Sequence, residues 1–257
     1  MNNSESHVFC DTLNTNYFEP KILNDSILGV KIFKIELEKY VKILDVLFKM
    51  LSPEEQKRSQ RFHQFKDKQT FIICRSVLKY LLSKETGLDV SQIHFVLNDN
   101  NKPYLQLDYP LFFNVSHSGN YAIIALSNQE IGVDIEQINS DFDYNEIVPT
   151  VFNNLEINTI DNSENKNYTF YKFWTRKEAI VKATGKGIDD DITQITVVDG
   201  LHSVSSQLLS GSKNITVFSF DITPEYLGAI AITEHFNDIQ NIQFEPSPKP
   251  EDLISIN

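Results

Sequence analysis

Two carboxylates, Asp134 and Glu136, stand two residues apart in the apolar segment IGVDIE at 131–136. Residues i and i+2 of an extended strand point to the same face, so we expect one face to carry aliphatic side chains and the other to carry two like charges. A third carboxylate, Glu178, lies four residues before Lys182 in FWTRKEAIVKATGKG, and this spacing puts both on one face of a helix. These four residues predict a site that binds or moves charged groups.

Oxygen ligands of this kind indicate a metal site. Like charges close together in a semi-buried place are costly unless a cation neutralises them, and carboxylates suit Mg²⁺, with Mn²⁺ as the alternative ion. No Cys/His cluster in the sequence favours zinc. We predict that Asp134, Glu136 and Glu178 hold the metal and that Lys177 and Lys182 contact a phosphate. A Glu–Lys pair at this spacing is also common as a surface salt bridge, and that alternative stays open.

A polar turn adds further candidates. The segment FNVSHSG at 113–119 places Asn114, Ser116 and His117 where a strand meets a turn, and hydroxyls and backbone N–H groups at such a junction can face a ligand. A Ser–His pair also suggests a hydrolase, but a nucleophile and base this close in sequence lack the third orienting group. The alternative is that His117 is an ordinary polar residue of a turn and binds no ligand.

Composition limits the partners. The 257 residues carry a net charge of −12 with a pI near 4.9, which argues against a nucleic-acid-binding surface because phosphates need clustered cations. The basic segment at 57–68, which includes Arg58, is either a solvated helix face or a small anion site. The sequence shows no signal peptide and no apolar run long enough to span a membrane, so we expect no membrane partner. Two cysteines make no disulfide framework, which favours a reduced, cytoplasmic setting.

The elements that must position these residues follow a duplicated pattern. Residues 70–96 and 169–198 each begin Thr-Phe, continue as a helix to Thr-Gly and end in a β-rich segment, and two similar apolar strands follow at 120–127 and 225–233. We predict an α+β fold of two similar lobes related by a pseudo-twofold duplication, with the active site in the cleft between them. The lobes are expected at 1–127 and 128–240, followed by a loose, proline-containing tail at 241–257. Chance similarity of amphipathic helices is the alternative.

A coarse assignment completes the expectation. Ser52 followed by Pro53 and two glutamates predicts the start of a helix. Hydrophobic periodicity predicts strands at 28–37, 92–97, 103–107, 111–115, 121–127, 131–136, 193–198, 203–209, 214–222 and 226–233, and helices at 39–51, 67–85, 143–159 and 168–184.

Four motifs in order resemble a known family. NNKP at 100–103, FNVSHSG at 113–119, IGVDIE at 131–136 and FWTRKEAIVKATGKGI at 173–188 are similar to the successive signatures of the 4′-phosphopantetheinyl transferases, in particular the two-lobed surfactin-synthetase-activating type. The interval of 44 residues from Asp134 to Glu178 is typical of that group. Each motif is weak, the ordered set is specific, and the resemblance covers roughly residues 28–235.

The resemblance implies an activity and roles for residues. The enzyme would move the phosphopantetheine arm of coenzyme A to a serine of an apo acyl or peptidyl carrier protein, with release of 3′,5′-ADP, as a monomer serving fatty acid, polyketide or non-ribosomal peptide synthesis. The metal ligands would be Asp134, Glu136 and Glu178; Glu178 would be the base and Lys182 would contact phosphate. The other residues expected at the coenzyme are Arg58 and His117 at its 3′-phosphate, Lys102 near its nucleotide, and Asn114, Ser116 and Lys177.

Three positions depart from the family pattern. Asn101 replaces the usual glycine before Lys-Pro, and asparagine tolerates positive φ. Thr70 and Glu55 stand where some members have a cation, so two contacts to the 3′-phosphate are missing unless Lys57, Arg61, Lys66 or Arg75 replaces them. We therefore expect weakened discrimination between coenzyme A and 3′-dephospho-coenzyme A.

Docking and rival functions complete the expectations. Because the enzyme is acidic, long-range attraction is a poor way to recruit an acidic carrier, and we expect a local apolar patch at 143–159, whose residues could equally belong to the core. A Mg²⁺-dependent nuclease is the rival enzyme, since carboxylate clusters also suit phosphodiester cleavage. A non-catalytic duplicate that binds coenzyme A or a carrier protein is the rival from another class.

Overall fold

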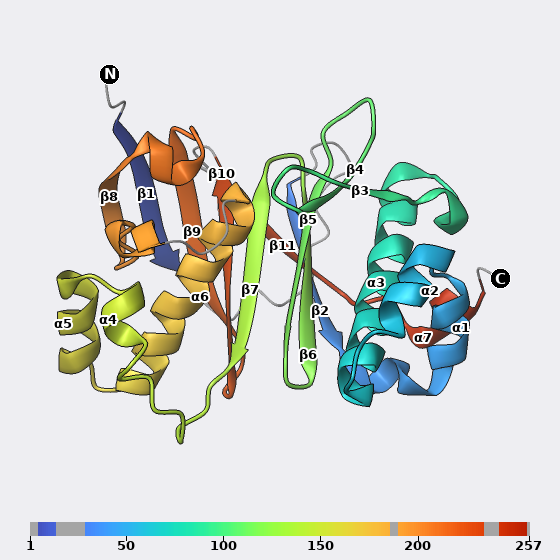
Figure 1. Ribbon diagram of the computed structural model, residues 1–257, viewed down its shortest axis with the longest axis horizontal. Coiled ribbons are helices and arrows are strands. Elements are labelled where there is room, and N and C mark those ends of the chain that lie inside the picture. Colours follow the sequence, from blue (N-terminus) through green and yellow to red (C-terminus); the bar gives the residue numbers. More distant parts are fainter. Residues whose placement is uncertain (1–4, 14–28, 186–189, 234–241, 256–257) are drawn as a thin grey trace.

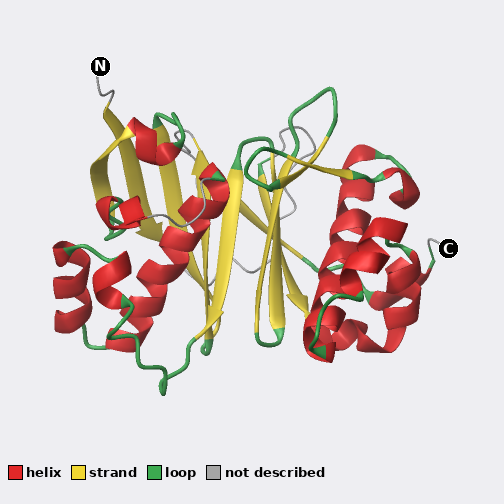
Figure 2. Ribbon diagram, in the orientation of Figure 1, coloured by secondary structure: helices red, strands yellow, loops and turns green. Residues whose placement is uncertain are grey.

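The computed structural model describes residues 5–13, 29–185, 190–233 and 242–255. Two β-sheets meet in the middle of the molecule, and the helices cover their outer sides (Figures 1 and 2). The predicted two-lobed α+β fold is confirmed. None of the described helices is long and apolar enough to cross a membrane.

Lobe one is built on a four-stranded sheet of order β11-β2-β6-β5. Its strands are β2 (Val30–Glu36), β5 (Phe112–Ser118), β6 (Tyr121–Ser127) and β11 (Ile242–Glu245), and β3 (Phe95–Leu97) pairs with β4 (Pro103–Leu105) in a separate ribbon. Its helices are η2 (Leu37–Ile43), α1 (Leu44–Lys49), α2 (Pro53–Ser59), α3 (Phe65–Thr86), η3 (Val90–Gln92) and α7 (Pro250–Ile254).

Lobe two is built on a five-stranded sheet of order β7-β10-β9-β1-β8. Its strands are β1 (Glu5–Thr12), β7 (Ile131–Gln137), β8 (Gly200–Ser205), β9 (Asn214–Thr223) and β10 (Tyr226–Thr233). Its helices are α4 (Val148–Val151), α5 (Asn154–Asn162), α6 (Lys166–Thr184), η4 (Asp190–Gln194) and η5 (Ser206–Leu209).

The duplication predicted from the sequence is visible in the strand order. The run β2-β6-β5 of lobe one corresponds to β7-β10-β9 of lobe two, and the long helices α3 and α6 cover equivalent faces (Figure 1). Both helices end at a glycine in the left-handed conformation, Gly87 with φ 73° and Gly185 with φ 68°, where a side chain would be strained. The helix start predicted at Ser52 is also present: its Oγ accepts the Glu55 N–H, and the Glu55 carboxylate accepts the Ser52 N–H in return.

The two ends of the chain depart from the predicted division. β1 pairs in parallel with β9 and antiparallel with β8, so residues 5–12 lie in lobe two although the chain enters lobe one next. β11 pairs with β2, and α7 inserts the fully buried Leu253 into the core of lobe one. The expectation of a loose tail is therefore wrong. The prolines do not prevent packing, because Pro250 occupies the first turn of α7, where proline is well tolerated.

Several predicted elements differ from the structure. The strand expected at 203–209 ends with β8 at Ser205, and Ser206–Leu209 form η5. The helix expected at 143–159 is divided into α4 and α5, because the Asn153 side chain accepts the N–H groups of Leu155 and Glu156 and so starts a new helix. The strand expected at 193–198 is instead the end of η4 followed by irregular chain. Its apolar residues are buried against α6 without joining a sheet.

A core shared by both lobes holds the two sheets together. It contains buried side chains from each sheet, among them Ile32, Ile123 and Ala125 of lobe one and Ile131, Val133, Ile135, Phe218 and Ile230 of lobe two. Each such side chain contributes roughly 1.5–3 kcal/mol when it leaves water. The aliphatic face of IGVDIE thus fixes β7 between the lobes and leaves its carboxylate face toward α6.

Candidate active site

The site lies where β5, β7 and α6 meet. Helix α6 lies directly on β7, because a Cβ at Gly132 would come within 2.1 Å of the Ala179 carbonyl oxygen and 2.3 Å of the Ala183 nitrogen. Only glycine permits this approach. It places one face of α6, which carries Glu178 and Lys182, beside the carboxylate face of the strand.

Asp134 is the centre of the site. Its side chain is 4% exposed. The Lys182 ammonium donates to Asp134 Oδ1 at 2.6 Å and to Ser116 Oγ at 2.9 Å, and the Ser116 hydroxyl donates to the same Oδ1 at 2.8 Å. One oxygen of the Asp134 carboxylate on β7 therefore accepts hydrogen bonds from Ser116 of β5 and from Lys182 of α6.

The second oxygen of Asp134 fits the role of a cation ligand. Oδ2 is buried and accepts no hydrogen bond from the part of the chain that the structure describes. A buried carboxylate oxygen without a partner is costly, and native sites of this kind commonly receive an ion or a ligand. The donor chemistry, an oxygen atom flanked by further carboxylates, fits Mg²⁺ or Mn²⁺.

Glu136 and Glu178 are both near enough to Asp134 to be influenced by its charge. Burial, reinforced by the charge of Asp134, raises the pKa of both carboxyl groups, and Glu136 accepts a hydrogen bond from Ser118 Oγ at 2.9 Å. As the side chains stand, no group of three His, Cys, Asp or Glu residues in the described ranges is close enough to hold a metal ion. The three predicted ligands, Asp134, Glu136 and Glu178, therefore lie on the neighbouring elements β7 and α6, but their carboxylates do not converge on one point. The Lys182 ammonium is hydrogen-bonded to Oδ1 of Asp134.

These raised pKa values predict a pH-dependent gain in stability when a charge is removed. Replacing Glu178 with glutamine should make the metal-free protein more resistant to unfolding at pH 8, because the folded state disfavours the ionised carboxylate. Below the ordinary pKa of 4.5 the carboxyl is protonated in both states, so the advantage should vanish there and grow as pH rises through the raised folded-state pKa. Urea unfolding from pH 4 to pH 8 measures it. An advantage independent of pH would contradict this interpretation.

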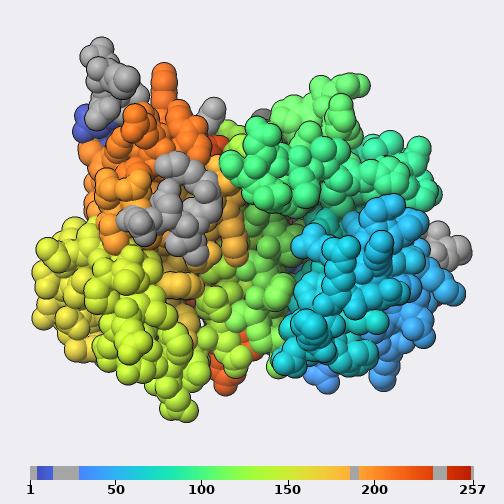
Figure 3. Space-filling model, viewed as in Figure 1, coloured from blue at the N-terminus to red at the C-terminus, as the bar shows by residue number. Residues whose placement is uncertain are grey.

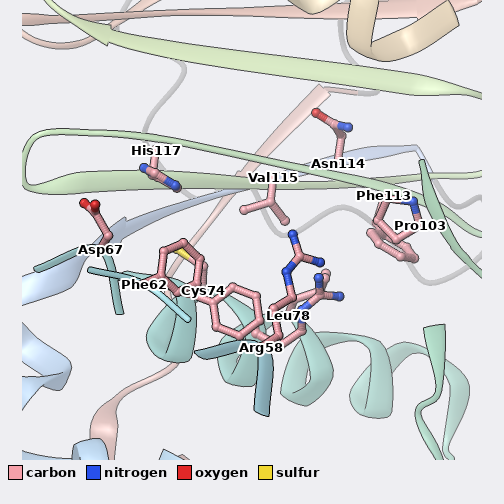
Figure 4. A pocket seen from close by; sticks show the side chains of 12 residues that line it. Arg58, Phe62, Asp67, Cys74, Leu78, Pro103, Phe113, Asn114, Val115 and His117 are labelled. Carbon is pink, nitrogen blue, oxygen red and sulfur yellow. The ribbon is translucent and has the colours of Figure 1, made fainter. Parts of the chain in front are cut away.

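A pocket of about 620 Å³ lies between α2, α3 and β5, and Asn114 and His117 of β5 line it (Figure 4). Its lining combines aromatic side chains with the cations Arg58 and Arg75, the imidazole of His117 and the carboxylate of Asp67. Desolvation of the ring, and then the charge of Lys182, lower the pKa of His117. The carboxylate site and the pocket are therefore electrostatically connected through Lys182 and His117. Figure 3 shows this middle region, coloured yellow-green, between the two lobes.

Of the four cations that the sequence offered as replacements for the missing contacts (Lys57, Arg61, Lys66 and Arg75), Arg75 is the one that lines this pocket. Its guanidinium lies 4.4 Å from the centre of the Phe95 ring and 3.5 Å from the Glu55 carboxylate, which also lies 3.5 Å from the buried ammonium of Lys79. Glu55 therefore neutralises two cations of α3 from its place on α2. Arg75 stands four residues after Phe71, so the sequence places both side chains on one face of the helix, and both line the pocket.

Two predicted residues are engaged elsewhere. Lys177 is 1% exposed and binds Glu156 at 3.0 Å and the carbonyl oxygens of Ile192 and Ile195 at 2.9 Å each. The prediction that Lys177 contacts a phosphate is therefore wrong: one residue before Glu178 on a helix, its side chain points into the core of lobe two.

Lys102 is also held by the protein. Its ammonium donates to Glu130 at 2.6 Å and to the carbonyl oxygens of Ile131 and Ala183 at 3.2 and 3.0 Å. It thereby ties the turn before β4 to the start of β7 and the end of α6. Asn114 lines the pocket, while its Oδ1 accepts the Val133 N–H at 3.0 Å.

Two family models match successive parts of the chain. The model described as 4′-phosphopantetheinyl transferase, N-terminal, matches residues 40–129, and the model of the 4′-phosphopantetheinyl transferase superfamily matches residues 130–231. The matches meet in the connection between β6 and β7.

Relatives of this kind occur in bacteria and in an animal. The 4′-phosphopantetheinyl transferase HetI of Nostoc sp. is 31% identical over 177 residues, which is 66% of this chain and 75% of the relative. The 4′-phosphopantetheinyl transferase Sfp of Bacillus subtilis is 29% identical over 204 residues, 76% of this chain and 88% of the relative. The L-aminoadipate-semialdehyde dehydrogenase-phosphopantetheinyl transferase of Rattus norvegicus is 24% identical over 226 residues, 78% and 73% of the two chains. The chain therefore belongs to the 4′-phosphopantetheinyl transferase superfamily and is of the two-lobed surfactin-synthetase-activating type.

Proposed function

We propose that this enzyme transfers 4′-phosphopantetheine from coenzyme A to a serine of an apo acyl or peptidyl carrier protein and releases 3′,5′-ADP. Its family membership makes it a phosphopantetheinyl transferase that acts on carrier proteins. The observation that carries the finer proposal is the unpartnered Oδ2 of Asp134, supported by a pocket of about 620 Å³ that contains Arg58 and Arg75 and is large enough for a nucleotide. This combination favours a transferase over a nuclease or a protein that only binds.

The proposed metal ligands are Asp134, Glu136 and Glu178. When bound, Mg²⁺ or Mn²⁺ would neutralise charge on the pyrophosphate of coenzyme A. The chain would supply Oδ2 of Asp134 as the buried ligand, and the two glutamates as the further carboxylate ligands. The Lys182 ammonium, now paired with Asp134 Oδ1, is close enough to the same centre to contact a phosphate oxygen.

Glu178 is the proposed base. The carrier serine oxygen forms a bond to the phosphorus that bears pantetheine, the bond from that phosphorus to the bridging oxygen breaks, and that oxygen leaves with 3′,5′-ADP. The serine proton must go to a base, and burial raises the pKa of Glu178 toward the working range of an acid–base group. Lys182 would stabilise charge that develops on the phosphate.

The pocket is proposed to hold the nucleotide of coenzyme A, with Arg58, Arg75 and His117 near the 3′-phosphate. Thr70 is buried in α3, and Glu55 is paired with Arg75 and Lys79. Arg75 thus supplies a cation that the sequence comparison with the family left open. We therefore replace the expectation of weak discrimination with a preference for coenzyme A over 3′-dephospho-coenzyme A.

Replacing Arg75 with glutamine should reduce that preference by about 10- to 100-fold, the effect of losing one charge-assisted hydrogen bond. The measurement is kcat/KM with each substrate for both proteins. The dephosphorylated substrate is the internal control, because general damage to the pocket would lower both rates together. An unchanged ratio would remove Arg75 from the 3′-phosphate site.

The carrier surface needs a correction. Within the expected patch at 143–159, Val151 and Phe152 are buried in the core of lobe two and cannot meet a partner, whereas Leu155 is 52% exposed and Ile147 lines a surface groove. We propose instead that the carrier contacts a groove of about 240 Å³ next to Glu136, which includes the exposed Phe142 and the partly buried Trp174. The working form is proposed to be a cytoplasmic monomer.

Release of the nucleotide tests the proposal. Chromatography of a reaction containing enzyme, coenzyme A, Mg²⁺ and apo carrier protein should detect 3′,5′-ADP. The nucleotide should be absent when the carrier serine is replaced by alanine. Cleavage of purified DNA by the same preparation, without release of 3′,5′-ADP, would favour the nuclease.

A further inference from the structure

The edge strands of the two sheets face one another across the lobe boundary. β5 ends the sheet of lobe one and β7 ends the sheet of lobe two, and the two are not neighbours within either sheet. The contacts between them use polar side chains of β5. Residues 114, 116 and 118 alternate along the strand and so share one face.

Each of these three side chains binds a successive position of β7. The Val133 N–H donates to Asn114 Oδ1 at 3.0 Å, and Ser116 Oγ donates to Asp134 at 2.8 Å. Ser118 Oγ donates to Glu136 Oε2 at 2.9 Å and accepts the Gln137 N–H at 3.1 Å. Successive polar side chains of β5 are therefore matched with successive residues of β7, and two of them bind its carboxylates.

We propose that Ser118 is a positioning residue that holds Glu136 beside Asp134 and thereby sets the affinity of the site for a divalent cation. Ser118 binds both the Glu136 carboxylate and the backbone N–H of the next residue, so it fixes the side chain relative to its own strand. A hydrogen bond of this kind orients a ligand and commonly changes metal affinity by 10–100-fold when removed. The inference rests on the metal site of the proposed function.

Ser116 serves Asp134 in a different way. Its hydroxyl donates to Asp134 while accepting from Lys182, so removing it disturbs the catalytic lysine as well. The hydrogen bonds of Ser118 within the described residues go to Glu136 and Gln137 and not to Lys182, so it is the cleaner residue to test. If the Ser118 hydroxyl were removed, the half-buried Glu136 carboxylate would lose this hydrogen-bond donor and could rotate away from Asp134.

The experiment measures Mn²⁺ binding by electron paramagnetic resonance on the enzyme without coenzyme A. Replacing Ser118 with alanine should weaken binding about tenfold or more, whereas Ser118→Thr, which keeps the hydroxyl, should bind within a few-fold of the wild type. Ser127→Ala is the matched control: Ser127 is buried in the neighbouring strand β6, and its hydroxyl accepts the Gln129 N–H, away from the carboxylates. It should bind Mn²⁺ as the wild type does.

A kinetic measurement separates positioning from general damage. For Ser118→Ala, the Mg²⁺ concentration that gives half the maximal transfer rate should rise by a similar factor, while kcat at saturating Mg²⁺ changes little. Equal Mn²⁺ affinities for Ser118→Ala and Ser127→Ala would overturn the inference and leave the proposed transfer reaction standing. A wild-type enzyme that transfers the arm but binds no Mn²⁺ would overturn both the inference and the proposed metal site.

Discussion

Replacing Asp134 with asparagine is expected to reduce transfer by at least about 100- to 1000-fold while the protein remains folded. Asparagine has almost the shape of aspartate but carries no charge, so it cannot attract a divalent cation through the buried Oδ2 or pair with Lys182. The folded state should tolerate the change, because the charge at this buried position is itself disfavoured: burial raises the pKa of Asp134 despite Lys182 and Ser116. Steady-state transfer rates and thermal unfolding of the same samples measure the two halves of this prediction.

Glu178→Ala is the companion variant. It removes the proposed base and one proposed ligand from α6 while leaving the Asp134–Lys182 pair in place. Transfer should again be lost in a protein with native circular dichroism. Retained transfer at saturating Mg²⁺ in both variants would contradict the assignment of the site.

Replacing Arg176 with methionine should lower the free energy of unfolding by about 3–5 kcal/mol, the cost of breaking a buried, paired charge. Arg176 has no exposed surface, and its guanidinium donates to Val197 O at 2.6 Å, Ser219 Oγ at 2.7 Å and the Asp199 carboxylate at 2.6 Å. Methionine fills similar space but removes the donor from the buried Val197 carbonyl and the buried Ser219 hydroxyl, whereas the more exposed Asp199 keeps its hydrogen bond from Lys172. Urea denaturation measures the loss.

Arg61→Met is the matched control, because Arg61 is exposed beyond the end of α2. The same change of residue type there should alter stability by no more than about 0.5 kcal/mol. Similar losses for the two variants would show that Arg176 does not stabilise lobe two through its buried hydrogen bonds. The contrast also separates Arg176 from the neighbouring residues of α6 that are proposed to act in transfer.

The parts of the site that the sequence predicts are those fixed by local periodicity. The alternation of IGVDIE placed Asp134 and Glu136 on one face, and the four-residue spacing placed Glu178 and Lys182 together on α6. Lys177 shows the limit of this reasoning: its assignment depended on which side of α6 meets the core, and the ion pair with Glu156 that holds it comes from a distant part of the chain.

Contacts between distant segments account for the other differences. Nothing local in the sequence indicates that β1 completes the second sheet or that Leu253 enters the first core. The role of Ser118 also depends on β5 and β7 meeting across the lobes, since the sequence alone assigns that serine to a polar turn. The duplication predicted the two lobes, but the way their edge strands face each other is a property of the assembled fold.

The mass of an apo carrier protein after incubation with the wild-type enzyme, coenzyme A and Mg²⁺ tests the central claim most directly. The carrier should gain one phosphopantetheine group on its acceptor serine, and the parallel reaction with the Asp134→Asn enzyme should leave its mass unchanged. A carrier that stays unmodified by wild-type enzyme, across carriers of fatty acid, polyketide and peptide synthesis, would contradict the proposed transfer. Modification at equal rates by both enzymes would show that the transfer does not depend on the site built around Asp134.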